Sequence, residues 1–179
     1  MILCLIKWFK ACRMALILWR PKMAILSSET IRLGASAASK QEAIQQAGAL
    51  LVASGCVAAN YVDGMLKREQ VISTYLGNGV AIPHGQHENM ADVIRTGIAV
   101  VQFPAGVEWE PGELAYLVIG IAANADEHVG VLANLAEVIE DEAIVQQLAQ
   151  TSDPSQILEQ LGRAREEEAY DEERHHAGA

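Results

Sequence analysis

Residues 74–85 constrain this chain more than any other stretch, and they read T-Y-L-G-N-G-V-A-I-P-H-G. The Gly-Asn-Gly triplet predicts a turn, because glycine and asparagine adopt positive φ at little cost. The apolar, β-branched run 80–82 is typical of a buried strand, and Pro83 should end it, because proline has no N–H for a sheet ladder. We therefore expect His84 at a strand end, with Gly85 leaving its imidazole open to a bulky reactant.

His84 is accordingly the first candidate reactive residue. An imidazole at such a place can act as a nucleophile, a general base or a metal ligand. A histidine at the start of an ordinary loop is more often hydrogen-bonded and inert. Here the rigid proline before it and the glycine after it favour a presented side chain.

Helical patterns surround this stretch. A helix is predicted to begin at Ser39, which forms a capping-box pattern with Glu42, and to end at Gly55. A second helix should start after Asn60. Further helices are expected from the sequence patterns that begin near residues 124, 141 and 153.

Two apolar runs, 97–103 and 114–122, predict buried strands, separated by a turn at 104–106 and a loop at 109–112. Residues 85–92 are expected to form a polar loop. The near-continuous apolarity of 114–122 indicates a strand covered on both faces. Helices that alternate with such strands predict an α/β fold with a mixed or parallel sheet.

Composition limits the function classes. The chain has 179 residues and is 51% hydrophobic, which suits one substantial core and one domain. Its net charge of −10 argues against nucleic acid as a partner, because phosphates repel an acidic protein. The cysteines, Cys4, Cys12 and Cys56, have no paired spacing, which predicts a reducing compartment and no disulfide framework.

The longer pattern R-E-x-x-x-x-T-Y-L-G-N-G-V-A-I-P-H-G runs from Arg68 to Gly85. It resembles the enzyme IIA domains of the bacterial sugar phosphotransferase system (PTS), mannitol/fructose type, and most closely the mannitol branch. The resemblance covers residues 23–163. It implies an α/β fold in which a mixed, mostly parallel β-sheet is flanked by helices on both faces.

The resemblance also implies roles for three residues. His84 matches the phosphorylated histidine, His128, in the run N-A-D-E-H, is similar to the second active-site histidine, and Arg68 looks like the arginine that assists the phosphoryl group. The implied protein is a cytoplasmic phosphotransferase component. It would accept phosphate from the phosphohistidine of the histidine phosphocarrier protein and pass it to a cysteine of an enzyme IIB domain, for uptake of a mannitol- or fructose-like sugar.

The residue types suit this chemistry. The attacking nitrogen of His84 must be unprotonated, so its other nitrogen should donate to a fixed acceptor. Arg68 could offer a planar fork to two phosphoryl oxygens, and His128, expected in a first helical turn, could donate to a third. The phosphoryl group would sit on a good nitrogen leaving group, so we expect neither a metal nor a cofactor.

The two ends of the chain differ from the middle. Residues 1–22 are apolar and basic, and neither of their apolar runs is long enough to span a bilayer, so we expect no stable membrane insertion. A membrane-surface segment, a signal peptide and a start-codon artefact stay open, and we favour the third because Met23 begins a run typical of enzyme IIA domains. Residues 164–179 are charged without apolar periodicity, which predicts a disordered tail after a domain at 23–163.

Two other functions compete with the phosphocarrier. A regulatory module would use the same phosphohistidine as a signal to a partner and would not feed a transporter. A zinc hydrolase would use His84, His87 and His128 as ligands. Because H-x-x-H in a loop is a weak pattern, we expect His87 to be a solvated loop residue.

Three further expectations concern neighbouring side chains. Val80, Ile82 and Trp109 are candidates for an apolar rim on which a partner docks. Glu69 is expected to be a surface charge and Asp126 a helix cap, neither of them an acid–base catalyst.

Overall fold

The computed structural model describes residues 25–123, 131–132, 135–136 and 138–161. The expectations for the extension 1–22, for the tail 164–179, and for Asp126 and His128 concern residues outside this part of the chain. Cys56, within it, is buried and has a free thiol, whereas Cys4 and Cys12 lie outside it.

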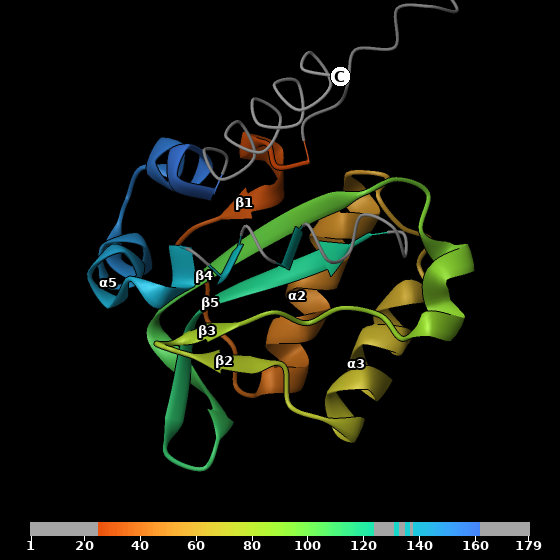
Figure 1. Ribbon diagram of the computed structural model, residues 1–179, viewed down its shortest axis with the longest axis horizontal. Helices are drawn as coiled ribbons and strands as arrows, with labels where there is room; N and C mark the ends of the chain where they lie inside the picture. The colour runs from red at the N-terminus through yellow and green to blue at the C-terminus, as the bar shows by residue number, and fades with distance from the viewer. Residues whose placement is uncertain (1–24, 124–130, 133–134, 137, 162–179) are drawn as a thin grey trace, which may run out of the picture.

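One five-stranded sheet lies at the centre of the described fold (Figure 1). The strands are β1 (Ile31–Arg32), β2 (Tyr75–Gly77), β3 (Val80–Ala81), β4 (Gly97–Glu110) and β5 (Glu113–Ala122). Their spatial order is β1-β4-β5-β3-β2. The β1–β4 and β3–β5 pairs are parallel, whereas β4–β5 and β2–β3 are antiparallel. The α/β fold with a mixed sheet, predicted from the sequence, is confirmed.

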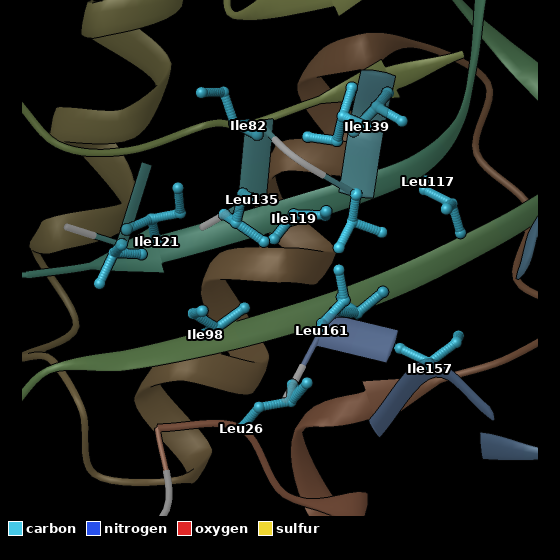
Figure 2. Packing of buried hydrophobic residues seen from close by; sticks show 14 of the residues in the cluster. Leu26, Ile82, Ile98, Leu117, Ile119, Ile121, Leu135, Ile139, Ile157 and Leu161 are labelled. Carbon is cyan, nitrogen blue, oxygen red and sulfur yellow. The ribbon is translucent and has the colours of Figure 1, made fainter. Parts of the chain in front are cut away.

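Both faces of the sheet are covered, because alternate residues of the central strands point to opposite sides. On β5, Ile119 and Ile121 belong to one buried cluster, and Val118 and Ala122 belong to another. The first cluster packs against the C-terminal helical residues, as Figure 2 shows for Leu135, Ile139, Ile157 and Leu161. The second cluster packs beneath the helices α2 (Lys40–Ala53) and α3 (Tyr61–Val71) on the other face (Figure 1).

The helices begin near the predicted residues, although the side chain of Asn60, before α3, makes no cap hydrogen bond. The Ser39 hydroxyl accepts the Glu42 N–H at 3.3 Å and starts α2, and Gly55, with φ +70°, follows its end. α3 begins directly after Asn60. The Asp141 carboxylate caps α5 (Glu142–Gln150), and residues 154–161 are also helical.

β4 is longer than predicted. The sequence predicted a strand over 97–103 and a turn at 104–106, but β4 continues through Pro104 to Glu110. Its register with β5 shifts between Gln102 and Val107, so the proline and Gly106, at φ +74°, lie in a bulge. A bulge accommodates proline because its missing N–H is not needed for the ladder there.

The expected polar loop after His84 contains a short 3₁₀ helix, η2 (His87–Asp92), none of whose residues is buried. Gln86 precedes it, and its N–H donates to the Asn89 side chain at 3.2 Å. In the part of the chain that the structure describes, no helix has the length and apolarity needed to cross a membrane.

Candidate functional site

His84 lies where the ladder between β3 and β5 breaks and then resumes. β3 ends at Ala81, but the Pro83 carbonyl accepts the Ile121 N–H at 3.0 Å, and His84 pairs with Ile121 in a parallel bridge. Proline lacks only the backbone N–H, so its carbonyl oxygen can still accept a hydrogen bond from the neighbouring strand. The backbone of His84 is therefore fixed against β5, while its side chain is only partly buried.

One hydrogen bond determines the state of the His84 ring. Nδ1 lies 2.8 Å from the carbonyl oxygen of Ile82. A carbonyl oxygen can only accept, so Nδ1 carries the proton and donates it. In the neutral imidazole, Nε2 is then the unprotonated nitrogen with the lone pair. This fixed acceptor is what the sequence argument required of a nucleophilic histidine.

Tyr61, at the start of α3, holds the residue after His84. Its hydroxyl accepts the Gly85 N–H at 2.9 Å and donates to the Ile121 carbonyl at 2.8 Å. Gly85 is required here, because a Cβ would lie 2.6 Å from Cε2 of the Tyr61 ring. The sequence predicted only that Gly85 keeps His84 accessible, and it gave no sign that the Tyr61 hydroxyl contacts this loop.

The η2 segment packs on the same helix. Asn89 lies against the backbone of α3 at Gly64, where a Cβ would collide with its side-chain amide. Asn60 donates to the Asp92 carboxylate at 2.7 Å. A glycine inside a helix can signal that another group approaches closely, and at Gly64 this group is the Asn89 side chain.

Arg68 lies on the same face of α3 as Tyr61, because residues seven positions apart in a helix return to nearly the same side. Its side chain is partly buried, and Nη1 donates to the Ile72 carbonyl at 2.7 Å. Arg68 and His84 line one pocket of about 280 Å³ together with Tyr61, Gly85, Gln86, His87, Met90, Val93 and Ala123. The structure thus brings together two of the three predicted site residues, and the third, His128, lies outside the described residues.

His87 is exposed at the start of η2 and lines the same pocket. Among the residues that the structure describes, no group of three histidine, cysteine, aspartate or glutamate side chains could hold a metal ion. His84 and Arg68 give the described part of the site an imidazole and a cation, a combination that suits an anionic group.

Glu69 is not a surface charge, which corrects the prediction. Its side chain is 3% exposed. One carboxylate oxygen accepts the Thr74 N–H at 2.9 Å and the Thr74 hydroxyl at 2.6 Å, and the other accepts from Lys40 Nζ at 3.0 Å. Lys40 also reaches Glu110 at 3.1 Å, and these carboxylate bonds raise the pKa of Lys40 against the opposing effect of its burial. A carboxylate can be buried when donors surround it in this way.

The predicted apolar rim is also wrong. Val80, Ile82 and Trp109 are 0%, 6% and 2% exposed, so they belong to the core and cannot meet a partner. Ile82 belongs to the buried cluster shown in Figure 2. The error has a simple cause, since apolar residues near a reactive group pack inward unless they lie on a loop.

A larger pocket, of about 800 Å³, lies at the other end of β5, between the Gly-Asn-Gly turn and α5. Its described lining residues include Tyr75, Tyr116, Glu113 and Glu142 and no histidine or cysteine. The candidate site is placed at His84 because of the chemistry of that residue and not because of pocket size.

Comparison with known proteins identifies the family of this chain. Residues 24–163 match the family model described as phosphoenolpyruvate-dependent sugar phosphotransferase system, EIIA 2. The multiphosphoryl transfer protein of Salmonella typhimurium is 51% identical over 123 residues, which cover 69% of this chain. The match takes in 33% of that protein, so this chain spans about a third of that relative's length.

Solved structures agree with the same family. A crystal structure of IIA mannitol from Escherichia coli is 43% identical, with a TM-score of 0.72, and covers 76% of this chain and 98% of that one. A complex of enzyme IIA and phosphorylated enzyme IIB of the mannitol system from Escherichia coli matches with 42% identity and a TM-score of 0.73 over 76% of this chain and 96% of that one.

Proposed function

This chain belongs to the EIIA 2 family of the phosphoenolpyruvate-dependent sugar phosphotransferase system, a family of phosphoryl-transfer components, and on this basis we propose that it is a cytoplasmic phosphocarrier that uses His84. Its donor is the phosphohistidine of the histidine phosphocarrier protein. Its acceptor is a cysteine of an enzyme IIB domain that serves uptake of a mannitol- or fructose-like sugar. The proposal depends most on the bond from His84 Nδ1 to Ile82, which leaves a lone pair on Nε2.

The first transfer forms one bond and breaks one bond. The Nε2 lone pair attacks phosphorus, an N–P bond forms on His84, and the donor's N–P bond breaks as its electron pair returns to the donor imidazole. In the second transfer, a cysteine thiolate of the enzyme IIB domain attacks the same phosphorus, and the electron pair of the His84 N–P bond returns to Nε2.

Two cationic or hydrogen-bonding groups assist the phosphoryl oxygens in this proposal. Arg68 lines the His84 pocket, and its planar guanidinium suits two oxygens at once. His128 is assigned a third contact from its place in the family pattern alone. Both would act mainly on the charge that is spread over the oxygens in the transition state.

Partners need a surface other than the predicted rim. Ile72 and Ile94 are 64% and 67% exposed. Ile72 accepts the Arg68 hydrogen bond, and Ile94 follows Val93 of the His84 pocket, so both lie beside the site. We assign to them the apolar contacts with donor and acceptor, which agrees with the small interfaces of transient complexes.

The decisive experiment mixes the purified protein with phosphoenolpyruvate, enzyme I and the histidine phosphocarrier protein and measures its intact mass. We expect gain of one acid-labile phosphoryl group in the wild type and none in His84→Ala. His87→Ala is the matched control, because it changes the other described histidine that lines the pocket, and it should be labelled normally.

Labelling of His84→Ala, or no labelling of the wild type when the helper proteins label a control domain, would refute the proposal. Addition of enzyme IIB domains then separates the two uses of the phosphoryl group. Rapid loss to a mannitol- or fructose-type IIB domain supports transport, whereas a stable phosphohistidine in the presence of all of them supports the regulatory alternative.

A further inference from the structure

The Tyr61 hydroxyl joins two backbone segments that flank His84. It accepts from the N–H of Gly85, the residue directly after His84, and donates to the carbonyl of Ile121. Ile121 is the β5 residue that pairs with His84, and its N–H donates to Pro83, the residue directly before His84. The backbone on both sides of the histidine is therefore tied to a single β5 residue.

The direction of these bonds is fixed. A backbone N–H can only donate and a carbonyl oxygen can only accept, so the hydroxyl proton must point to Ile121. Tyr61 is 3% exposed. Burial raises the pKa of Tyr61, although the Gly85 hydrogen bond partly opposes that rise, so the hydroxyl keeps its proton at neutral pH.

The position of the hydroxyl is also fixed. The Tyr61 ring fills the space beside Gly85 that a Cβ would need, and the residue belongs to the buried cluster beneath α2 and α3. A buried aromatic ring in such packing has few alternative rotamers. The Tyr61 hydroxyl oxygen therefore links α3, the loop after His84 and β5.

We propose that Tyr61 is a positioning residue for phosphoryl transfer, which clamps Gly85 to Ile121 so that the His84 ring keeps its bond to Ile82 and directs Nε2 into the pocket. This inference rests on the proposed function of His84. Tyr61 itself has no part in bond making. Its effect is geometric, and transfer between two nitrogens depends strongly on the alignment of the attacking atom.

The test is Tyr61→Phe, which keeps the ring and removes the oxygen. The matched control is Tyr75→Phe. Tyr75 holds Gly79, at the other end of β3, with a hydroxyl that accepts the Gly79 N–H at 3.1 Å and lies 3.1 Å from a Glu113 carboxylate oxygen. The control thus removes the same kind of clamp without touching the His84 loop.

Rates of phosphoryl transfer are measured with saturating and limiting phosphorylated donor, and nitrogen NMR reports the two His84 ring nitrogens. For Tyr61→Phe we expect kcat to fall about tenfold with KM nearly unchanged, and the His84 nitrogen signals to shift toward a mixture of tautomers. For Tyr75→Phe we expect less than about a twofold change and unshifted His84 signals.

A wild-type rate in Tyr61→Phe, an equal loss in Tyr75→Phe, or slower transfer with unchanged His84 signals would each overturn the inference. The NMR comparison needs no phosphoryl group, so it tests the clamp even if the wild type proves unable to accept phosphate, an outcome that refutes the proposed function instead.

A measurement on the wild type covers the case in which Tyr61→Phe does not fold. Hydrogen exchange of the Gly85 amide should be slow, since its N–H is bound to a buried hydroxyl. Exchange as fast as that of the exposed Glu88 amide in η2 would mean that the clamp does not hold, and would overturn the inference.

Discussion

Two tyrosine hydroxyls hold the two ends of the β3 segment, and they differ in their surroundings. At the turn end, Tyr75 accepts the Gly79 N–H and contacts Glu113 and Leu114 at the start of β5. At the histidine end, Tyr61 accepts the Gly85 N–H and donates to the far end of β5. Tyr61 is buried, whereas the bonds from Tyr75 to β5 are exposed.

The difference lies in what covers each end. α3 packs over the histidine end and supplies Tyr61, the glycine that receives Asn89, and Arg68. The turn end borders the larger pocket, whose described lining residues include no histidine or cysteine. Similar hydrogen bonds thus hold a turn at one end and the proposed reactive side chain at the other, and pocket size does not distinguish the two uses.

The largest effect is expected at the histidine end. Arg68→Ala should slow phosphoryl transfer about 100-fold, because a guanidinium near the phosphoryl oxygens is lost, while the melting temperature stays nearly constant. This rate is measured in assays in which transfer from the phosphorylated donor is quenched at set times. The control is Lys67→Ala, which removes the exposed cation next to Arg68 and should leave the transfer rate normal. An equal loss of rate in this variant would show that the total positive charge matters and not the position of Arg68.

Glu69→Gln should affect both the turn end and the histidine end of the β3 segment. The buried carboxylate holds Thr74 and Lys40, and an amide cannot accept from all of their donors at once. We expect the free energy of unfolding to fall by about 2–3 kcal/mol in urea titrations, and transfer to slow as well, since Arg68 is the preceding residue. Glu108→Gln, at an exposed carboxylate, is the control, and equal stability of the two variants would contradict the assignment.

At the turn end, substitutions should change the stability of the fold without changing the rate of phosphoryl transfer. Asn78 has φ +50°, and its amide donates to the Ile139 carbonyl at 3.0 Å. Asn78→Ala loses the bond and keeps the unfavourable φ, so we expect a loss of about 2 kcal/mol, whereas Asn78→Gly should lose only about 1 kcal/mol. Thermal unfolding checks both values, and slower phosphoryl transfer in either variant would show that the two ends are coupled.

The smallest effect is pH-dependent. Hydrogen bonds from Ser73 and then Lys40 lower the pKa of Glu110 below its ordinary value of 4.5. The folded state therefore favours the ionised Glu110 carboxylate. The contribution of this carboxylate to the free energy of unfolding is complete above its ordinary pKa and is lost as the pH falls through its lowered pKa. Glu110→Gln should melt slightly below the wild type at about pH 6 and should match it in strong acid. A difference that grows on acidification would contradict this sign.

Much of the fold could be predicted because its signals are local. Ser39 with Glu42 marks a helix start, and the uninterrupted apolar run of β5 marks a strand covered on both faces. His84 could be placed at a strand end because the proline before it and the turn before the strand are both local features. The family resemblance adds Arg68 by the same local pattern.

The failures have a common physical cause, which is dependence on distant partners. Glu69 is buried because Lys40, 29 residues earlier, comes to meet it. Trp109 lies in the core because β4 continues through a bulge that its partner strand accommodates. Tyr61 acts on the His84 loop through bonds to residues 24 and 60 positions away. No pattern of neighbouring residues records such contacts.

The proton on Nδ1 of His84 has a consequence for the whole relay. Because that proton stays on Nδ1, which donates it to the Ile82 carbonyl, a phosphoryl group that moves to and from the lone pair of Nε2 exchanges no proton with water at this ring. Under the proposed function, neither loading nor unloading of His84 therefore requires a proton transfer at the imidazole. The direction of flow is set by the abundance of charged donors and empty acceptors, with no acid–base step to make it one-way.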